Sequence, residues 1–513
     1  MRRCALASFL ALLSLAPACQ GGEGSAGRGI LVIAVDAWRA EALAAAAELG
    51  AETRRLRRFL NQSVQFSSAW STAPEMLPGH TTLLTGCDPR VGLRPLELFG
   101  DPKEARWEWF LSPAVPRVAE AFLAGGWRTA AFVDDVRLAG RAGLDQGFQL
   151  FEDPGKALRY RGQFDPYGVD GVARRFHEWL KELDESEQWF AYLQLADLDR
   201  MWRVLNQEFG ALPEGHSGAD DPLLPVADAS ASFFAISRQR FDGTARSLRE
   251  YQAYYALAVE RLEQKLGGLF TLIDTLGWSQ HTTIVLVGSH GFGFGESGIV
   301  LDSGTLSDVD LHVPLLFHSP DAERVAGGRV IDALVSTADV AETLLDIAGL
   351  PRVAGMHGES LLSLLQGDAE PVREYAFASS GMVAGWATID ARYCFERVTF
   401  DVGPLSLASS FYGIERPTRD EVVALRSTVI ERLHDRVLDA RAGHLGLGAS
   451  DPTAIERLRA AGEQWNDLVF RARLVLHDPA GIVRPRPPEE IAYLLEQRML
   501  GQLERIDVEE GGE

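Results

Sequence analysis

The stretch ILVIAVD at residues 30–36 is an unbroken apolar run, rich in β-branched residues, that ends in an acidic residue. With Gly29 before it, such a run is typical of a strand buried on both faces of a parallel sheet. In sheets of this kind ligands bind beyond the carboxyl ends of the strands, which is where Asp36 lies. Asp36 is therefore the first candidate functional residue.

Similar apolar runs recur along the chain and alternate with helical patterns. The predicted strands are residues 30–35, 129–133, 189–195, 282–287 and 313–317, and the predicted helices include 78–84, 115–124, 169–183, 245–276 and 338–348. This alternation predicts an α/β fold with a mainly parallel sheet between helices. Residues 206–243 are polar and rich in turn-forming residues, which indicates an insertion.

The pattern changes after about residue 373. Short apolar runs at 375–378, 387–389 and 393–400 predict a small antiparallel sheet, and periodic stretches at 419–440, 454–476 and 489–503 predict helices. The expected organisation is a signal and tether at 1–28, an α/β domain at 29–370 and a C-terminal subdomain at 371–513.

Charge and cysteine content narrow the class of protein. The chain has 513 residues and a formal net charge of −22. A nucleic-acid binder needs a basic surface, so this balance excludes nucleic acid as a partner. Four cysteines in a chain of this length do not make a disulfide framework.

The N-terminus has the features of an export signal. Two arginines precede a short apolar run at residues 4–18, and Cys19 follows with a Gly/Ser-rich stretch after it. This arrangement resembles a bacterial lipoprotein signal and predicts attachment to the membrane through a lipid on Cys19. A cleaved signal without lipid and an uncleaved anchor are the alternatives. The expected location is the bacterial cell envelope, or else the periplasm or the extracellular space.

Several stretches, taken in order, resemble the sulfatase family of the alkaline-phosphatase superfamily. They are ILVIAVDAWR at 30–39, LPGHTTLLTG at 77–86, GGWRTAAFVDD at 125–135, WFAYLQLADLD at 189–199, TTIVLVGSHGFGFGESG at 282–298 and LHVPLLFHSP at 311–320. The resemblance runs to about residue 368. It implies the alkaline-phosphatase-like fold, with a smaller C-terminal antiparallel sheet.

The resemblance also implies roles for particular residues. Asp36 and His290 match metal ligands, so a divalent cation, Ca²⁺ or Mg²⁺, is the expected cofactor. The family's nucleophile position falls on Met76. His80 falls where the family has a residue that supports the nucleophile, and Pro78 of that motif is kept.

At several positions the chain departs from the family pattern. The thioether of Met76 has no proton to lose and cannot act as the nucleophile. Ser289 stands where a metal-binding carboxylate is expected, and Ala37 where many relatives have a second Asp. Asp199 and the segment 302–305 stand where the family has cationic groups. Cys87-Asp88-Pro89-Arg90 resembles a modification motif with its Arg one residue early, so we predict an ordinary thiol there.

These departures predict an exported, catalytically degenerate sulfatase-family protein that binds an unknown ligand or protein partner at the former active site. The alternative is an active metal-dependent hydrolase of sulfuric or phosphoric esters with a rearranged site. Its metal would be held by Asp36 and His290, and its nucleophile would be one of Thr72, Thr81, Thr82 or Ser289. A transferase or a structural envelope protein is the third possibility.

Overall fold

The computed structural model describes residues 28–42, 54–97, 107–154, 167–201, 243–294, 300–368, 370–380, 385–390, 393–398, 436–439 and 452–477, with short pieces between 212 and 241. The predicted export signal with Cys19, most of the insertion at 206–243 and the predicted helix at 489–503 lie outside the described residues.

A central sheet organises the described part of the chain. Its eight strands lie in the order β14 (Arg329–Ser336), β2 (Val64–Trp70), β13 (Leu315–His318), β10 (Thr282–Gly288), β1 (Gly29–Val35), β7 (Trp189–Leu195), β5 (Arg128–Phe132) and β6 (Leu150–Glu152). Only β13 runs antiparallel to its neighbours. The mainly parallel sheet of the α/β prediction is thus confirmed.

The register of the three central strands places their carboxyl ends side by side. Val35 of β1 lies opposite Gly288 of β10 and Leu195 of β7. The ladder continues one step further, because Asp36 N–H donates to the Leu195 carbonyl and Ser289 N–H donates to the Val35 carbonyl, both at 2.9 Å. Residues that follow these three strands therefore meet at one edge of the sheet.

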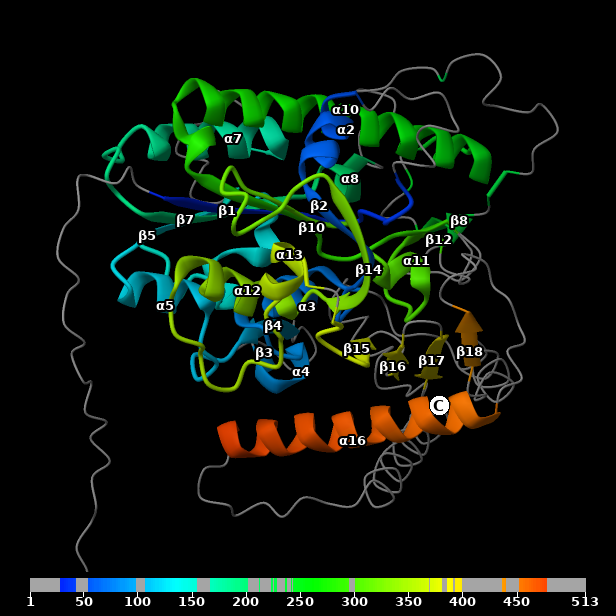
Figure 1. The fold of residues 1–513 in the computed structure, drawn as a ribbon. Coiled ribbons are helices and arrows are strands. Elements are labelled where there is room, and N and C mark those ends of the chain that lie inside the picture. The colour runs from blue at the N-terminus through cyan, green and yellow to red at the C-terminus, as the bar shows by residue number, and fades with distance from the viewer. Residues whose placement is uncertain are drawn as a thin grey trace, which may run out of the picture.

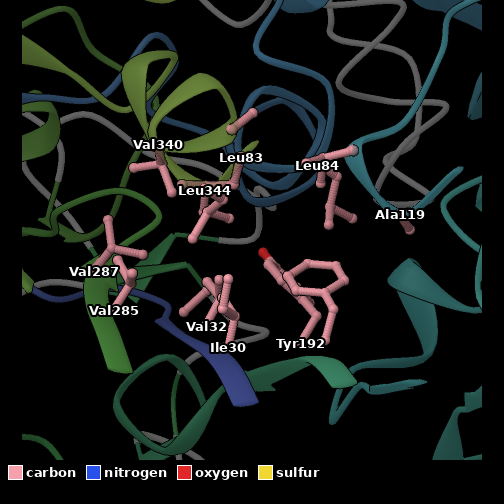
Figure 2. Close-up of a cluster of buried hydrophobic side chains, with 14 of the residues drawn as sticks. Ile30, Val32, Leu83, Leu84, Ala119, Tyr192, Val285, Val287, Val340 and Leu344 are labelled. Carbon is pink, nitrogen blue, oxygen red and sulfur yellow. The ribbon is translucent and has the colours of Figure 1, made fainter. Parts of the chain in front are cut away.

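Helices cover both faces of the sheet, as Figure 1 shows. One layer holds α2 (Arg54–Gln62), α7 (Gly168–Leu180) and α10 (Leu248–Thr275), and the other holds α3 (Met76–Thr85), α5 (Val118–Ala124) and α12 (Asp339–Ala348). Alternate residues of β1 belong to the two core clusters: Leu31 and Ile33 to one, Ile30 and Val32 to the other. In the second cluster, strand residues face Leu83, Leu84, Val340 and Leu344 of the helices (Figure 2). Burial on both faces explains why the strand is apolar throughout.

Shorter elements complete the α/β part. The small strands are β3 (Leu93–Glu97), β4 (Trp107–Leu111), β8 (Val226–Ala227), β9 (Ile236–Ser237), β11 (Gly293–Phe294) and β12 (Val300–Asp302). The short helices are α4 (Pro89–Gly92), α8 (Asp197–Arg200), α11 (Asp308–Leu311) and α13 (Leu362–Gln366), with 3₁₀ turns at Val136–Leu138, Gly140–Ala142 and Trp278–Gln280. Among the described helices, none has the length and apolar character needed to cross a membrane.

An antiparallel sheet follows, as predicted. Its strands are β15 (Ala376–Ser380), β16 (Gly385–Ile389), β17 (Tyr393–Val398) and β18 (Arg436–Asp439), and the long helix α16 (Pro452–His477) comes after them. The prediction of a helix over 419–440 is wrong at its end, because residues 436–439 pair with β17. The rest of that predicted helix lies outside the described residues.

Helix α16 packs against both parts of the molecule and lies beneath the C-terminal strands in Figure 1. The indole N–H of Trp465 donates to Asp88 Oδ2 at 3.0 Å, and the Trp465 ring stacks on Phe377 with centroids 4.5 Å apart. Cys87, next to Asp88, is a free buried thiol, and burial raises its pKa to about 11. The segment 88–90 therefore holds α16.

Candidate functional site

Helix α3 brings the resembling motif to the carboxyl edge of the sheet. Met76 is its first residue and His80 lies four residues later, so the two side chains share one helix face. Pro78 falls in the first turn, where a missing N–H costs no helical hydrogen bond. The helix packs closely on the end of β10, because a Cβ added at Gly79 would lie 2.7 Å from the Ser289 carbonyl oxygen.

Asp36 is the centre of a buried hydrogen-bond network. Its Oδ1 accepts from His80 Nε2 at 2.7 Å and from Ser289 Oγ at 2.5 Å, and its Oδ2 accepts from Gln194 Nε2 at 2.6 Å. Burial alone would raise the pKa of Asp36, but the neighbouring His80 and His290 and the hydrogen bonds from His80 and Ser289 outweigh it and lower that pKa. The group at the end of β1 is therefore a fully partnered carboxylate.

A second layer of hydrogen bonds fixes two of these donors. Gln194 Oε1 accepts from the backbone N–H groups of Asp134 at 2.6 Å and Asp135 at 3.0 Å. The amide oxygen must face those N–H groups, so the amide nitrogen must face Asp36. His80 Nδ1 lies 2.6 Å from the Tyr192 hydroxyl, which holds the imidazole plane.

The proton count also assigns the tautomer of His290. Ser289 Oγ lies between Asp36 Oδ1 and His290 Nδ1, which is 2.9 Å away. A hydroxyl has one proton and an ionised carboxylate can only accept, so Ser289 donates to Asp36 and accepts from His290 Nδ1–H. Burial lowers the pKa of His290 in spite of the nearby Asp36 and Asp199. A neutral ring then carries its lone pair on Nε2.

The residue after Asp36 has an unusual backbone conformation. Ala37 has φ = 58°, in the left-handed region that costs a non-glycine residue about 1 kcal/mol or more. The Tyr255 hydroxyl of α10 donates to the Ala37 carbonyl at 2.7 Å and helps to hold this turn. The turn gives the chain its direction from β1 toward His290, whose carbonyl accepts from Trp38 N–H.

Carboxylates neutralise the basic groups near this centre. Arg137 pairs with Asp135 at 2.9 Å and with Asp199 at 3.0 Å, and Arg39 pairs with Glu41. Asp199, at the position where the resemblance implies a cationic group, contributes a negative charge matched by Arg137. Neither Arg39 nor Arg137 is therefore a cation without a carboxylate partner.

The segment before the LHVPL stretch forms another closed network. Asp310 Oδ2 accepts from Thr305 N–H at 2.8 Å and Thr305 Oγ1 at 2.5 Å, and burial raises the pKa of Asp310 to about 7. The Ser380 hydroxyl lies 2.6 Å from the Gly304 carbonyl and 2.8 Å from Glu75 Oε1, beside the start of α3. Hydroxyls and carboxylates thus occupy the region where the resemblance led us to look for a cation.

Comparisons with known proteins agree with this architecture. A family model described as N-sulphoglucosamine sulphohydrolase, C-terminal, matches residues 295–379. An ulvan-active sulfatase from Formosa agariphila is 24% identical over 380 residues, which are 69% of this chain and 68% of that protein. A solved 2-O GAG sulfatase has a TM-score of 0.60 at 17% identity and covers 90% of this chain and 96% of its own. The chain is a sulfatase-family protein.

One more sequence relative and one more solved structure are similar to this chain. An extracellular sulfatase homolog from Drosophila melanogaster is 30% identical over 118 residues, 23% of this chain but only 10% of that relative's length. The phosphonate monoester hydrolase of Agrobacterium radiobacter has a TM-score of 0.59 at 19% identity, with 87% of this chain and 96% of that one covered. The alkaline-phosphatase-like fold implied by the resemblance is confirmed.

The donor set of this sulfatase-family chain does not fit a divalent cation at Asp36. Ca²⁺ takes six to eight oxygen ligands and Mg²⁺ six. Here Ser289 brings no charge, and Gln194 turns its N–H group, not its oxygen, toward the centre. In the part of the chain that the structure describes, no group of three or more His, Cys, Asp or Glu side chains could hold a metal ion.

The sequence predictions for the site can now be located. Asp36, His80, Ser289 and His290 form one hydrogen-bonded group, and Met76 lies one helical turn before His80. The assignment of Asp36 and His290 as metal ligands stays a prediction. Tyr192 and Gln194 were not anticipated. The signal for Gln194 was one polar residue within the otherwise apolar strand WFAYLQL.

Proposed function

We propose that this sulfatase-like protein no longer hydrolyses esters by its family's route and instead binds a ligand or protein partner at the former active site. The observation that carries the proposal is Met76 at the start of α3, one turn before a His80 that is bonded to Asp36. The surrounding arrangement is kept while the reacting group is gone. A thioether cannot form the covalent intermediate.

The other hydroxyls near α3 do not offer a substitute nucleophile. Thr72, Thr81, Thr82 and Ser289 are all at most 5% exposed, so an ester cannot reach them without movement of the core. The Thr82 hydroxyl lies 2.6 Å from that of Thr72 and donates to the Cys87 carbonyl, and the Ser289 hydroxyl donates to Asp36. These bonds support the degenerate reading over a rearranged hydrolase.

The local charges favour the same conclusion. Cleavage of a sulfate or phosphate ester needs positive groups that stabilise developing negative charge. Asp199 and Asp135 already pair with Arg137, and Glu41 pairs with Arg39. The chain as a whole carries a net charge of −22, so little positive field is left for an anionic transition state.

A turnover assay tests the proposal. Full-length protein is incubated with p-nitrophenyl sulfate, p-nitrophenyl phosphate and a phosphonate monoester, alongside the Asp36→Asn variant. We expect background turnover from both. Turnover by the wild type that disappears in Asp36→Asn would overturn the proposal and favour an active hydrolase. Circular dichroism at the assay temperature confirms that the variant is folded.

The relatives' names make a sulfated sugar the first ligand class to test, and the charge argument above predicts that it binds weakly. The relatives' names include an ulvan-active sulfatase and a 2-O GAG sulfatase, and the matching family model is named for N-sulphoglucosamine. Glucosamine 2-N-sulfate is therefore titrated into the protein by calorimetry, with glucosamine as the matched control. Heat that depends on the sulfate group would identify the ligand class, and no difference between the two sugars would direct the search to protein partners.

We further propose that the protein is exported and anchored by a lipid on Cys19, on the basis of the N-terminal sequence. Two relatives named as extracellular sulfatases, from Drosophila melanogaster and Caenorhabditis elegans, support export. In a bacterial host the wild type should partition with membranes and incorporate labelled palmitate. Cys19→Ser should abolish the label, whereas Cys4→Ser should not. Equal labelling of wild type and Cys19→Ser would contradict the anchor.

A further inference from the structure

We propose that the Asp36 centre of this chain works without a divalent cation, and that three protein hydrogen-bond donors occupy the cation's place. The donors are the His80 imidazole, the Ser289 hydroxyl and the Gln194 amide. The inference goes beyond the proposed function, because a chain that has lost its nucleophile could still keep a structural metal ion.

The oxygens of Asp36 are already used. A carboxylate offers about four lone-pair positions. Three are filled, at 2.5 and 2.7 Å on Oδ1 and at 2.6 Å on Oδ2. The side chains of Asp36 and His80 are fully buried. A cation at Oδ1 would have to displace both the imidazole and the hydroxyl from a site that is closed to water.

The donors cannot readily turn into ligands. If the Gln194 amide turned its oxygen toward Asp36, its nitrogen would face the N–H groups of Asp134 and Asp135, donor against donor. His80 is held on its other side by Tyr192. Ser289 is held by its own N–H on the Val35 carbonyl and by the tight packing of Gly79 on its carbonyl oxygen. The three donors are therefore held in place to stabilise the Asp36 carboxylate without a bound cation.

Among the described residues that contact Asp36, none brings the second negative charge that a divalent cation would need. Ser289 and Ala37, the two neighbours of Asp36 at the strand ends, carry no charge. Asp199, whose negative charge acts on His290, is already paired with Arg137. A single carboxylate and one imidazole fall well short of the six or more ligands of Ca²⁺ or Mg²⁺.

Thermal unfolding of the full-length wild type tests the proposal without any activity readout. The thermal midpoint is measured in EDTA and in about 1 mM CaCl₂, MgCl₂ or MnCl₂, where a site of micromolar affinity would raise it by several degrees. We expect a change of less than about 1 °C, within the effect of surface binding alone. A midpoint that falls in EDTA and returns with one equivalent of Ca²⁺ or Mg²⁺ would overturn the proposal.

Two variants then test whether Ser289 is the residue that decides. Ser289→Asp places a second carboxylate beside Asp36 Oδ1, so it should lower the midpoint in EDTA and regain it with Ca²⁺. Ser289→Asn, similar in size and neutral, should show no response to Ca²⁺. If Ser289→Asp folds and also shows no response, Ser289 is not the deciding residue, and that part of the inference is wrong. If Ser289→Asp does not fold, the wild-type unfolding measurement alone decides the inference. Turnover in the ester assay would refute the proposed function but would not test whether Asp36 binds a cation.

Discussion

The substitution Asp36→Asn separates a structural carboxylate from a functional one. The variant keeps the size of the side chain but loses the charge and one acceptor. Asn can accept from His80 and Ser289 through its oxygen, which leaves its NH₂ facing the NH₂ of Gln194. Gln194 cannot reverse its amide, because its oxygen accepts two backbone N–H groups. The variant therefore has two donors facing each other inside the core.

The magnitude follows from the bonds that are lost. A hydrogen bond to a charged group contributes about 1.5–3 kcal/mol, and an unsatisfied buried donor costs about 1–3 kcal/mol. Asp36 accepts three bonds, of which one is lost and two are weakened. We expect the free energy of unfolding to fall by about 2–4 kcal/mol, seen as a thermal midpoint lower by several degrees.

The pH dependence of this difference has a definite sign. The folded protein lowers the pKa of Asp36, so the carboxylate contributes its full stability above its unfolded pKa of about 3.9 and loses it as pH falls through the folded value. The gap between wild type and Asp36→Asn should be constant from pH 8 to pH 5 and shrink below about pH 4.

Asp310→Asn is the matched control, since Asp310 is equally buried but its pKa is raised to about 7. At pH 8, Asp310→Asn should leave the free energy of unfolding unchanged or increase it, whereas Asp36→Asn should lower it. An Asp36→Asn variant as stable as the wild type at pH 7 would refute the reasoning. It would mean that the Asp36 charge is poorly satisfied, as expected of a residue kept for binding a cation.

Three more predictions concern the surroundings of the site. The pKa of Asp310 lies above its unfolded value, so wild-type stability should fall as pH rises from about 4 to about 7, and Asp310→Asn should remove that fall in thermal midpoints measured across this range. Gly79→Ala should lower the free energy of unfolding, measured by chemical denaturation, by about 1–2 kcal/mol, because its Cβ meets the Ser289 carbonyl. Gly268→Ala, with open space around it in α10, should instead raise that free energy by about 0.5–1 kcal/mol. Trp465→Ala should lower the free energy of unfolding by about 2–3 kcal/mol and speed proteolysis within residues 452–477. Leu468→Ala, at a side chain that is 46% exposed on the same helix, should do neither. Equal proteolysis of the two variants would contradict the docking of α16 through Asp88.

The strands that are apolar on both faces were the elements best predicted from the sequence. β1, β7 and β10 were located to within a residue or so because each is a continuous apolar run. β2 and β14 were missed, since VQFSSAW and RVIDALVS mix polar and apolar residues and β14 lies at the sheet edge, with part of its length exposed. Residues 436–439 form a strand only because β17 lies beside them, and no local pattern reports that partner.

For the site, sequence could predict positions but not partners. Strand ends pointed to Asp36 and His290, and the motif pointed to His80 and Met76. That His80 would bond Asp36, and that Gln194 would fill the other oxygen, depends on where α3 and β7 stand in three dimensions. The orientation of the Gln194 amide depends in turn on the backbone of residues 134 and 135.

The left-handed turn at Ala37 bears on how this chain could be changed. A methyl side chain gains nothing from that conformation, whereas Asp, Asn and Gly tolerate it better. The main chain at residue 37 would therefore accept an Asp without a change of conformation. Adding Ala37→Asp to Ser289→Asp should therefore strengthen the response to Ca²⁺ through side-chain exchange alone, with no loop rebuilt. The contribution of each added carboxylate to cation binding can then be measured one residue at a time in this chain.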